Sequence, residues 1–261
     1  MSDDPAPSSR RESRRRERRR VSIIGVVGEL LVTAGLLVFL FLGWQLWLND
    51  VIVGEQQNAA AAELGHSWIA DIPPAPTNPD SPVTQPVSYG EPIVAKAPAE
   101  ATKFAVMYIP RFSADYRRSI AEGVGTVQVL NKDGVGHYPG TQMPGEVGNF
   151  AVAAHRTTHG APFNSIATLR VGDRIYVQTE QGYYTYVYRN TEYVYPNGVG
   201  VKDPVPQSKT PATTDRLLTM TSCNPKLSAA ERIVAYSVFE SWQPLSAGPP
   251  AEIAALVQKG S

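Results

Sequence analysis

A single cysteine, Cys223, occurs in the 261 residues of the chain. A disulfide within the chain is therefore excluded, whereas secreted domains that rely on disulfides normally carry an even number of cysteines. The lone thiol has three interpretations: an inert core side chain, an intermolecular bridge or a reactive nucleophile. The cysteine count alone does not distinguish these three interpretations, so the residues around Cys223 have to be considered.

The chain also lacks net charge, with 24 basic and 24 acidic side chains. This balance hides a division along the sequence. Residues 10–20 contain eight arginines and two glutamates, whereas the residues after 48 carry 16 Lys and Arg against 19 Asp and Glu, a net charge of −3. Because a folded domain that binds nucleic acid presents a basic face, we expect no nucleic-acid partner.

Recognisable metal-ligand patterns are lacking as well. The chain has four histidines, and the spacing of His137, His155 and His159 fits no zinc motif. No cluster of acidic residues indicates a calcium site. We therefore expect neither a metal nor a cofactor.

One long apolar segment is present, from residue 21 to residue 47, interrupted by Glu29 and Gln45. About 20 apolar residues suffice for a helix to cross a bilayer core. The arginines precede the segment, so the positive-inside rule predicts a cytoplasmic N-terminus and an extracellular remainder. The apolar region is too long for a secretory signal, and no A-x-A site follows it closely. We predict an uncleaved, single-pass anchor in the cell membrane.

Composition divides the chain into five predicted segments. These are a cytoplasmic basic tail (1–20), a transmembrane signal anchor (21–48), an Ala- and Pro-rich extracellular stalk (49–101), a folded domain (102–245) and a C-terminal tail (246–261). Within the stalk, the alanine-rich residues 58–63 favour a short helix, and eight prolines between residues 73 and 98 favour a semi-extended chain. The tail has room for one helical turn.

The folded domain has the pattern of a mainly β protein. Runs rich in β-branched and aromatic residues predict strands at 104–109, 150–155, 174–179, 183–188, 217–222 and 232–242. Short helices are expected at 113–122, 162–169 and 228–231. Many short strands at regular spacing predict a closed barrel or a sandwich.

Cys223 is predicted to lie at the end of a strand, because the turn-forming pair Asn224-Pro225 follows it. Side chains alternate between the two faces of a strand. Thr219, Thr221 and Cys223 therefore share one face, and its side chains are small and polar. A structural cysteine lies more often in mid-strand among large aliphatic residues, so this position indicates a reactive thiol as readily as an inert one.

Two further side chains at strand ends suit thiol chemistry. His155 ends its predicted strand as Cys223 does, and an imidazole beside a thiol promotes ionisation and can return a proton to a leaving amine. Arg232 opens the next strand, nine residues after Cys223, and the connection is long enough to bring both strand ends to one rim. A guanidinium there can stabilise an oxyanion.

The ordered set of these elements resembles the sortase family. The nucleophile strand reads TMTSC (219–223), the histidine strand NFAVAAHR (149–156) and the arginine strand ERIV (231–234). Two further segments, GVGHYPGT (134–141) and HRTTHGAPF (155–163), are similar to class E, the actinobacterial subgroup. The resemblance covers about residues 103–243, in the family's order and spacing.

The resemblance implies a closed eight-stranded β-barrel with short helices, preceded by the transmembrane helix. It implies that Cys223 attacks the Thr–Gly bond of a C-terminal sorting signal of LPXTG type, LAXTG in class E, and forms a thioacyl-enzyme. His155 would transfer protons and Arg232 would stabilise the oxyanion, while His137, Tyr138 and Thr221 would line the substrate groove. Implied partners are secreted proteins that bear the signal and an amine of lipid II or peptidoglycan.

Two alternatives remain. An L,D-transpeptidase also uses His and Cys in an extracytoplasmic β-domain, but it has a Ser-x-Gly-Cys element, and residues 221–223 here lack the glycine. A non-catalytic anchored β-domain that binds the cell wall or a partner would carry an unreactive Cys223. A papain-like peptidase would place its cysteine before its histidine, which is the reverse of the order found here.

Overall fold

The structure is a computed structural model of the chain, and it describes residues 22–44, 48–70, 72, 88–208 and 212–258. It divides into two compact units, Met1–Gly43 and Trp44–Ser261. The predicted basic tail, 1–20, lies outside the described residues.

The first unit contains helix α1, Ile23–Gly43, within the predicted anchor. The most apolar 18-residue window of this 21-residue helix has a mean hydropathy of 2.4. None of the helix residues is buried within the protein. A helix of this length and composition can cross a hydrocarbon core of about 30 Å.

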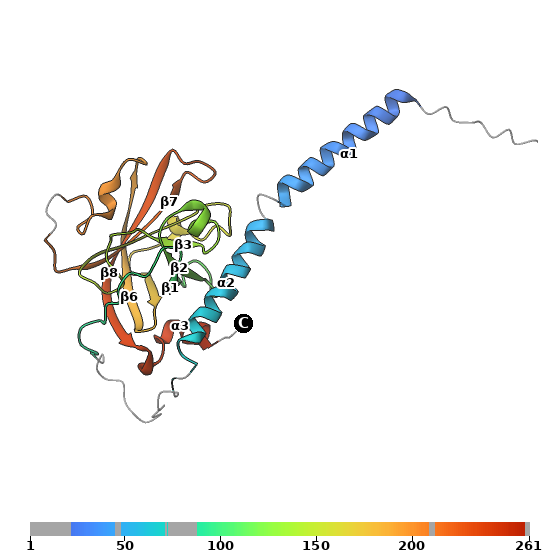
Figure 1. The fold of residues 1–261 in the computed structure, drawn as a ribbon. Coiled ribbons are helices and arrows are strands. Elements are labelled where there is room, and N and C mark those ends of the chain that lie inside the picture. Colours follow the sequence, from blue (N-terminus) through green and yellow to red (C-terminus); the bar gives the residue numbers. More distant parts are fainter. Residues whose placement is uncertain (1–21, 45–47, 71, 73–87, 209–211, 259–261) are drawn as a thin grey trace, which may run out of the picture. The chain divides into compact units, whose positions relative to one another are not determined.

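The second unit is a closed barrel of eight strands, as the sequence predicted (Figure 1). The strands are β1 (Lys103–Tyr108), β2 (Arg117–Glu122), β3 (Val135–His137), β4 (Gly148–Ala154), β5 (Arg174–Gln178), β6 (Gly182–Val194), β7 (Arg216–Asn224) and β8 (Glu231–Pro244). Their order around the barrel is β1-β2-β3-β4-β7-β8-β6-β5. The predicted strands at 174–179 and 183–188 correspond to β5 and β6, which pair in antiparallel register as a hairpin.

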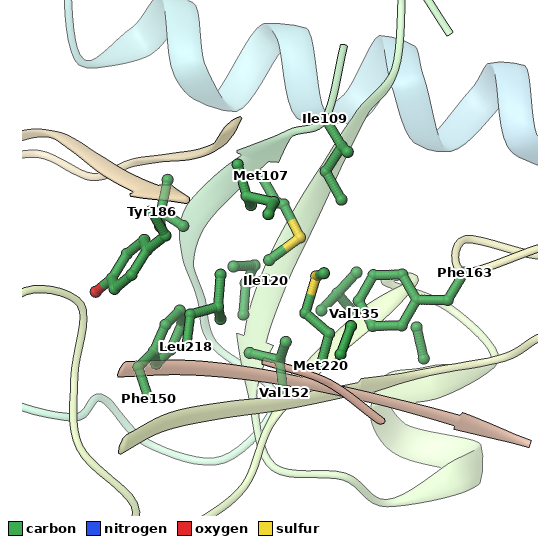
Figure 2. Close-up of a cluster of buried hydrophobic side chains, with 14 of the residues drawn as sticks. Met107, Ile109, Ile120, Val135, Phe150, Val152, Phe163, Tyr186, Leu218 and Met220 are labelled. Carbon is green, nitrogen blue, oxygen red and sulfur yellow. The ribbon is translucent and has the colours of Figure 1, made fainter. Parts of the chain in front are cut away.

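Large side chains from most strands fill the barrel interior. Met107 of β1, Ile120 of β2, Phe150 of β4 and Met220 of β7 are fully buried in one cluster (Figure 2). Because side chains alternate along a strand, the neighbours of each buried residue on its own strand face outward. The interior is therefore a packed core, and a ligand has to bind on the outside of the barrel.

The predicted helix at 113–122 is wrong, because residues 117–122 form strand β2 between β1 and β3. A strand at the surface shows alternating burial, but Arg118 and Ser119 are both buried here. Helix α2, Asn49–Ser67, packs against the outer face of β2 and removes the alternation on which a sequence prediction relies. The short strand β3 gave no sequence signal and was also missed.

The other two predicted short helices are absent or shortened in the described residues. Of the range 162–169, only Ile166–Thr168 forms a 3-10 turn. Residues 228–230 form no helix, and β8 begins at Glu231. A π-helical turn, Thr126–Leu130, precedes β3 instead.

The range predicted as a stalk contains helix α2, which is longer than the short helix expected there and contacts the barrel. Its buried face carries small and amide side chains at helical spacing: Gly54, Gln57, Asn58, Ala61, Ala62 and Gly65. The sequence gives no amphipathic signal because this face lacks large apolar residues. Small residues bring the helix backbone close to the barrel, and Gln178 donates a hydrogen bond to the Gly65 carbonyl at 3.0 Å.

Two further segments outside the barrel contact it. After the undescribed residues, the chain runs along the barrel, where the Trp242 indole donates to the Gly90 carbonyl at 2.9 Å. The predicted tail forms helix α3, Ala251–Gln258, rather than a single helical turn. Its Ile253 and Val257 are buried in a second apolar cluster with residues of α2 and β1, so the C-terminal helix belongs to the folded unit.

Candidate active site

Three neighbouring strands carry the predicted catalytic residues at one level of the barrel. Strands β4 and β7 run parallel, with Ala153 opposite Thr221. His155 directly follows β4 and Cys223 lies in β7, each two residues beyond this pair, so both lie at the same end of the two parallel strands. Strands β7 and β8 run antiparallel, and there Cys223 lies directly opposite Arg232.

The three side chains also share a face. Ala154, Met220 and Ile233 belong to the interior cluster, so alternation turns His155, Cys223 and Arg232 to the outside. Adjacent strands lie about 4.8 Å apart. Cys223, His155 and Arg232 therefore lie at neighbouring strand ends on the outer face of the barrel, at the same end of β7.

His155 is half-buried and held on two sides. Its Nε2 lies 2.8 Å from Asn131 Oδ1, and its ring stacks on that of His159, with centroids 5.0 Å apart. Burial lowers the pKa of His155 below its ordinary value of 6.5, the neighbouring His159 lowers it further, and Asp50 of α2 opposes the shift. The lowered pKa favours the neutral imidazole, which is the form that can accept a proton.

Asn131 was not found by sequence reasoning. It follows the π-helical turn before β3 and reaches His155 across 24 positions of the chain. An asparagine after a turn is ordinary in sequence, so no local signal distinguishes it. In the structure its carbonyl oxygen orients the imidazole, much as a carboxamide or carboxylate does in other Cys–His pairs.

Arg232 is positioned by the connection between β7 and β8. Its Nη1 donates to the carbonyls of Ala229 and Glu231 at 3.0 and 2.9 Å. A guanidinium has five N–H donors, and these contacts engage one nitrogen. The group is fixed beside Cys223 with donor capacity left for the oxygen of a bound carbonyl.

A second arginine, Arg156, joins the histidine strand to the end of the cysteine strand, and sequence reasoning passed over it. The side chain is buried, and its Nη1 donates to the Cys223 carbonyl at 3.4 Å and to Asn224 Oδ1 at 3.3 Å. Its Nε donates to the Asn164 carbonyl at 3.1 Å. These bonds tie β4 to β7 beside the thiol.

Tyr138 and Thr221, both predicted groove residues, contact each other. The Tyr138 hydroxyl lies 2.9 Å from Thr221 Oγ1, and the Lys202 ammonium lies 5.1 Å from the centre of the tyrosine ring. Thr221 shares the outer face of β7 with Cys223, and Ala153 beside it on β4 has only a methyl group. Both side chains are buried, with 4% of Thr221 and 8% of Ala153 exposed, so the role of Thr221 and Tyr138 in binding a peptide stays a prediction.

His137, the third predicted groove residue, has a different environment. It is fully buried, packs between Phe104 and Phe150, and places Nδ1 2.6 Å from Glu122 Oε2. Its Nε2 lies 2.9 Å from Thr141 Oγ1. A side chain enclosed in this way does not line an open groove, and the contacts give it a structural role that supports the neighbouring Tyr138.

His137→Ala is expected to lower the free energy of unfolding by roughly 3 kcal/mol, because it leaves the buried Glu122 carboxylate without its partner. Chemical denaturation measures this change. Tyr195→Ala, at a side chain that is 72% exposed, is the matched control and should leave stability unchanged. A stable His137→Ala protein with a raised KM would instead make His137 a substrate-binding residue.

The described residues offer little for a metal. Among them, no group of three or more His, Cys, Asp and Glu side chains is arranged to hold an ion. The chemistry available at the end of β7 is therefore that of a thiol, an imidazole and a guanidinium around a carbonyl group.

Comparisons with known proteins agree with this geometry. Residues 107–240 match the family profile described as the sortase domain. The chain is 34% identical over 256 residues to sortase SrtE1 of Streptomyces coelicolor, which covers 94% of this chain and 66% of SrtE1, so the chain spans about two thirds of that relative.

Solved structures give the same result. The SrtA sortase from Actinomyces oris aligns with a TM-score of 0.60 and 32% identity over 63% of this chain and 94% of its own. Sortase E1 from Streptomyces coelicolor, solved with a tripeptide in the active site, aligns with a TM-score of 0.54 and 34% identity over 61% of this chain and 99% of its own.

Proposed function

This chain belongs to the sortase family and resembles its class E members, and from that premise we propose that it is a cysteine transpeptidase acting on C-terminal sorting signals. The signal is of LAXTG or LPXTG type, cleaved between Thr and Gly. The observation that supports the proposal is that Cys223 pairs with Arg232 across β7 and β8, while His155 follows β4 at the same end of the neighbouring parallel strand.

The first half-reaction forms a thioester. Neutral His155 accepts the proton of the Cys223 thiol while the sulfur attacks the threonine carbonyl carbon. The negative charge that develops on the carbonyl oxygen is stabilised by the Arg232 guanidinium. The C–N bond then breaks, the glycine nitrogen takes the proton from the His155 imidazolium, and the shortened protein stays bound to sulfur as a thioacyl-enzyme.

The second half-reaction transfers the protein. An amine of lipid II or peptidoglycan attacks the thioester carbonyl, and its proton passes to His155 as the C–S bond breaks. The proton then returns to the Cys223 sulfur. The peptide is proposed to bind beside Tyr138 and Thr221, whose hydroxyl groups contact each other. The related Sortase E1 was solved with a tripeptide in its active site.

Membrane attachment suits this reaction. Helix α1 is apolar and long enough to span the bilayer. The arginines before it favour a cytoplasmic N-terminus, which places the barrel outside the cell. Signal-bearing proteins and lipid II are both held at that membrane surface, so a tethered enzyme meets them at a higher effective concentration.

The direct test uses the full chain in detergent micelles with a quenched LAXTG peptide and a triglycine amine. Mass spectrometry should show cleavage after threonine and an amide bond to the amine. A scrambled peptide of the same composition serves as the control. The non-catalytic alternative predicts that neither product forms, and that result would overturn the proposal.

The pH dependence follows from the lowered pKa of His155. Because the first step needs a neutral imidazole, kcat/KM is expected to rise with pH on its acid side, through a midpoint below 6.5. A pH–rate profile with the quenched peptide measures this limb. An acid midpoint above 7 would mean that a different group accepts the proton.

A further inference from the structure

The loop that follows His155 has an unusual backbone. Thr158, His159 and Ala161 have φ values of 68°, 52° and 42°, and Gly160 between them has a φ of 79°. Left-handed backbone is unfavourable for residues with a Cβ atom, and such residues persist where the surroundings hold them. The loop therefore needs external contacts to keep its shape.

Helix α2 supplies these contacts from more than 100 positions earlier in the chain. One Asp50 oxygen accepts a hydrogen bond from the Thr158 amide at 2.9 Å, and the other accepts from the Gly160 amide at 3.3 Å. The Gln57 side chain donates to the His159 carbonyl at 3.0 Å. Two residues about two helical turns apart, Asp50 and Gln57, thus hold three consecutive residues of the loop.

The backbones of helix and loop approach closely at two glycines. A Cβ atom added to Gly160 would lie 3.1 Å from the Gly54 amide nitrogen and 2.5 Å from Gln57 Oε1. One added to Gly54 would lie 3.2 Å from Arg118 Nη2 and 3.5 Å from the Gly160 carbonyl oxygen. Glycine at position 160 is required both by its positive φ and by this approach.

The held loop in turn contacts the catalytic histidine. The His159 ring stacks on His155 with an angle of 27° between the ring planes. The His155 carbonyl accepts a hydrogen bond from the Phe163 amide at 3.0 Å, which closes the loop behind it. The position of the loop therefore determines where the imidazole lies relative to Cys223.

We propose that helix α2 is part of the active site, and that Asp50 and Gln57 are positioning residues that set the geometry of His155 through the 158–160 loop. This inference rests on the proposed function for its kinetic consequence. Since α2 begins at Asn49, six residues after α1 ends at Gly43, the segment next to the predicted anchor takes part in catalysis.

The test is the Asp50→Ala variant of the full chain in detergent, assayed with the LAXTG peptide. We expect kcat to fall about tenfold with KM unchanged, because the imidazole is misplaced while the peptide groove is intact. Amide hydrogen exchange in residues 156–161 should become faster. Asp50→Asn keeps one acceptor oxygen and should lie between the wild type and Asp50→Ala.

Gln56→Ala, an exposed position next to Gln57 on the same helix, is the matched control and should change neither kcat nor exchange. A merely structural helix contact would lower the thermal midpoint and leave kcat of the folded protein unchanged, which would overturn the inference. Unchanged exchange in Asp50→Ala would also overturn it. If the wild-type chain cleaves no peptide, the proposed function fails, and the exchange measurement still decides whether α2 holds the loop.

Discussion

Replacing Cys223 by alanine is expected to abolish both peptide cleavage and amide transfer, with kcat/KM lower by a factor of roughly 10³ or more. The sulfur atom of Cys223 is the atom that becomes acylated, and the methyl group of alanine cannot replace it. Because this is the single cysteine of the chain, no other thiol can substitute. The quenched-peptide assay measures the loss directly.

A second experiment on Cys223 tests whether a covalent intermediate forms. Mass spectrometry of the wild-type chain with peptide and no acceptor amine should show one added acyl group, and iodoacetamide should block its formation with a single adduct. Cys223→Ser is the matched control, since it preserves shape and polarity but presents a far weaker nucleophile. Retained activity in Cys223→Ala would remove the basis of the transpeptidase proposal.

Replacing His155 by alanine is expected to lower kcat by about 10²- to 10⁴-fold, the range typical of a lost general acid–base group. Two proton transfers depend on the imidazole: from the thiol during attack and to the glycine nitrogen during departure. Single-turnover kinetics with the LAXTG peptide separates these steps from binding. KM should change little, since Thr221 and Tyr138, the proposed peptide-binding residues, are not altered.

His159→Ala is the control for the histidine prediction. His159 stacks on His155 but lies in the loop beyond it, so its removal should cost at most about tenfold, an effect of positioning rather than of proton transfer. Alkylation of Cys223 at alkaline pH should proceed in both variants and show that the site remains accessible. Equal losses in the two variants would contradict the assignment of proton transfer to His155.

Local sequence signals were sufficient for the strands that carry the chemistry. Residues 217–222 and 232–242 are rich in β-branched and aromatic side chains, and the turn signal after Cys223 marks the strand end. The strand before His155, residues 150–155, was predicted in the same way, from its residue types and the polar segment after it. Alternation also predicts which residues of a strand share a face, and on that basis Cys223, His155 and Arg232 were proposed as catalytic residues before the fold was known.

Other elements depend on contacts between distant segments. Strand β2 was predicted as a helix because its sequence lacks the alternation of a surface strand, since α2 buries its outer face. The full length of α2 was not predicted because the buried face of this helix consists of small and amide residues. His137 lies next to Tyr138 in sequence, yet the strand pairing turns it toward Glu122 and the interior. In each case the partner that decides the outcome is far away in the chain.

By itself the sequence predicted the apolar helix and most of the strands, because apolar length, side-chain alternation and turn residues are properties of short segments. The closed eight-stranded barrel followed from the resemblance to sortases, on which the proposed roles of Cys223, His155 and Arg232 also rest. Only the tertiary structure showed that Asn131 contacts His155, that Arg156 contacts Cys223 and that Asp50 contacts the loop after His155. Hydrogen bonds such as that from Thr158 to Asp50 join residues 108 positions apart, and such contacts exist only once the chain has folded.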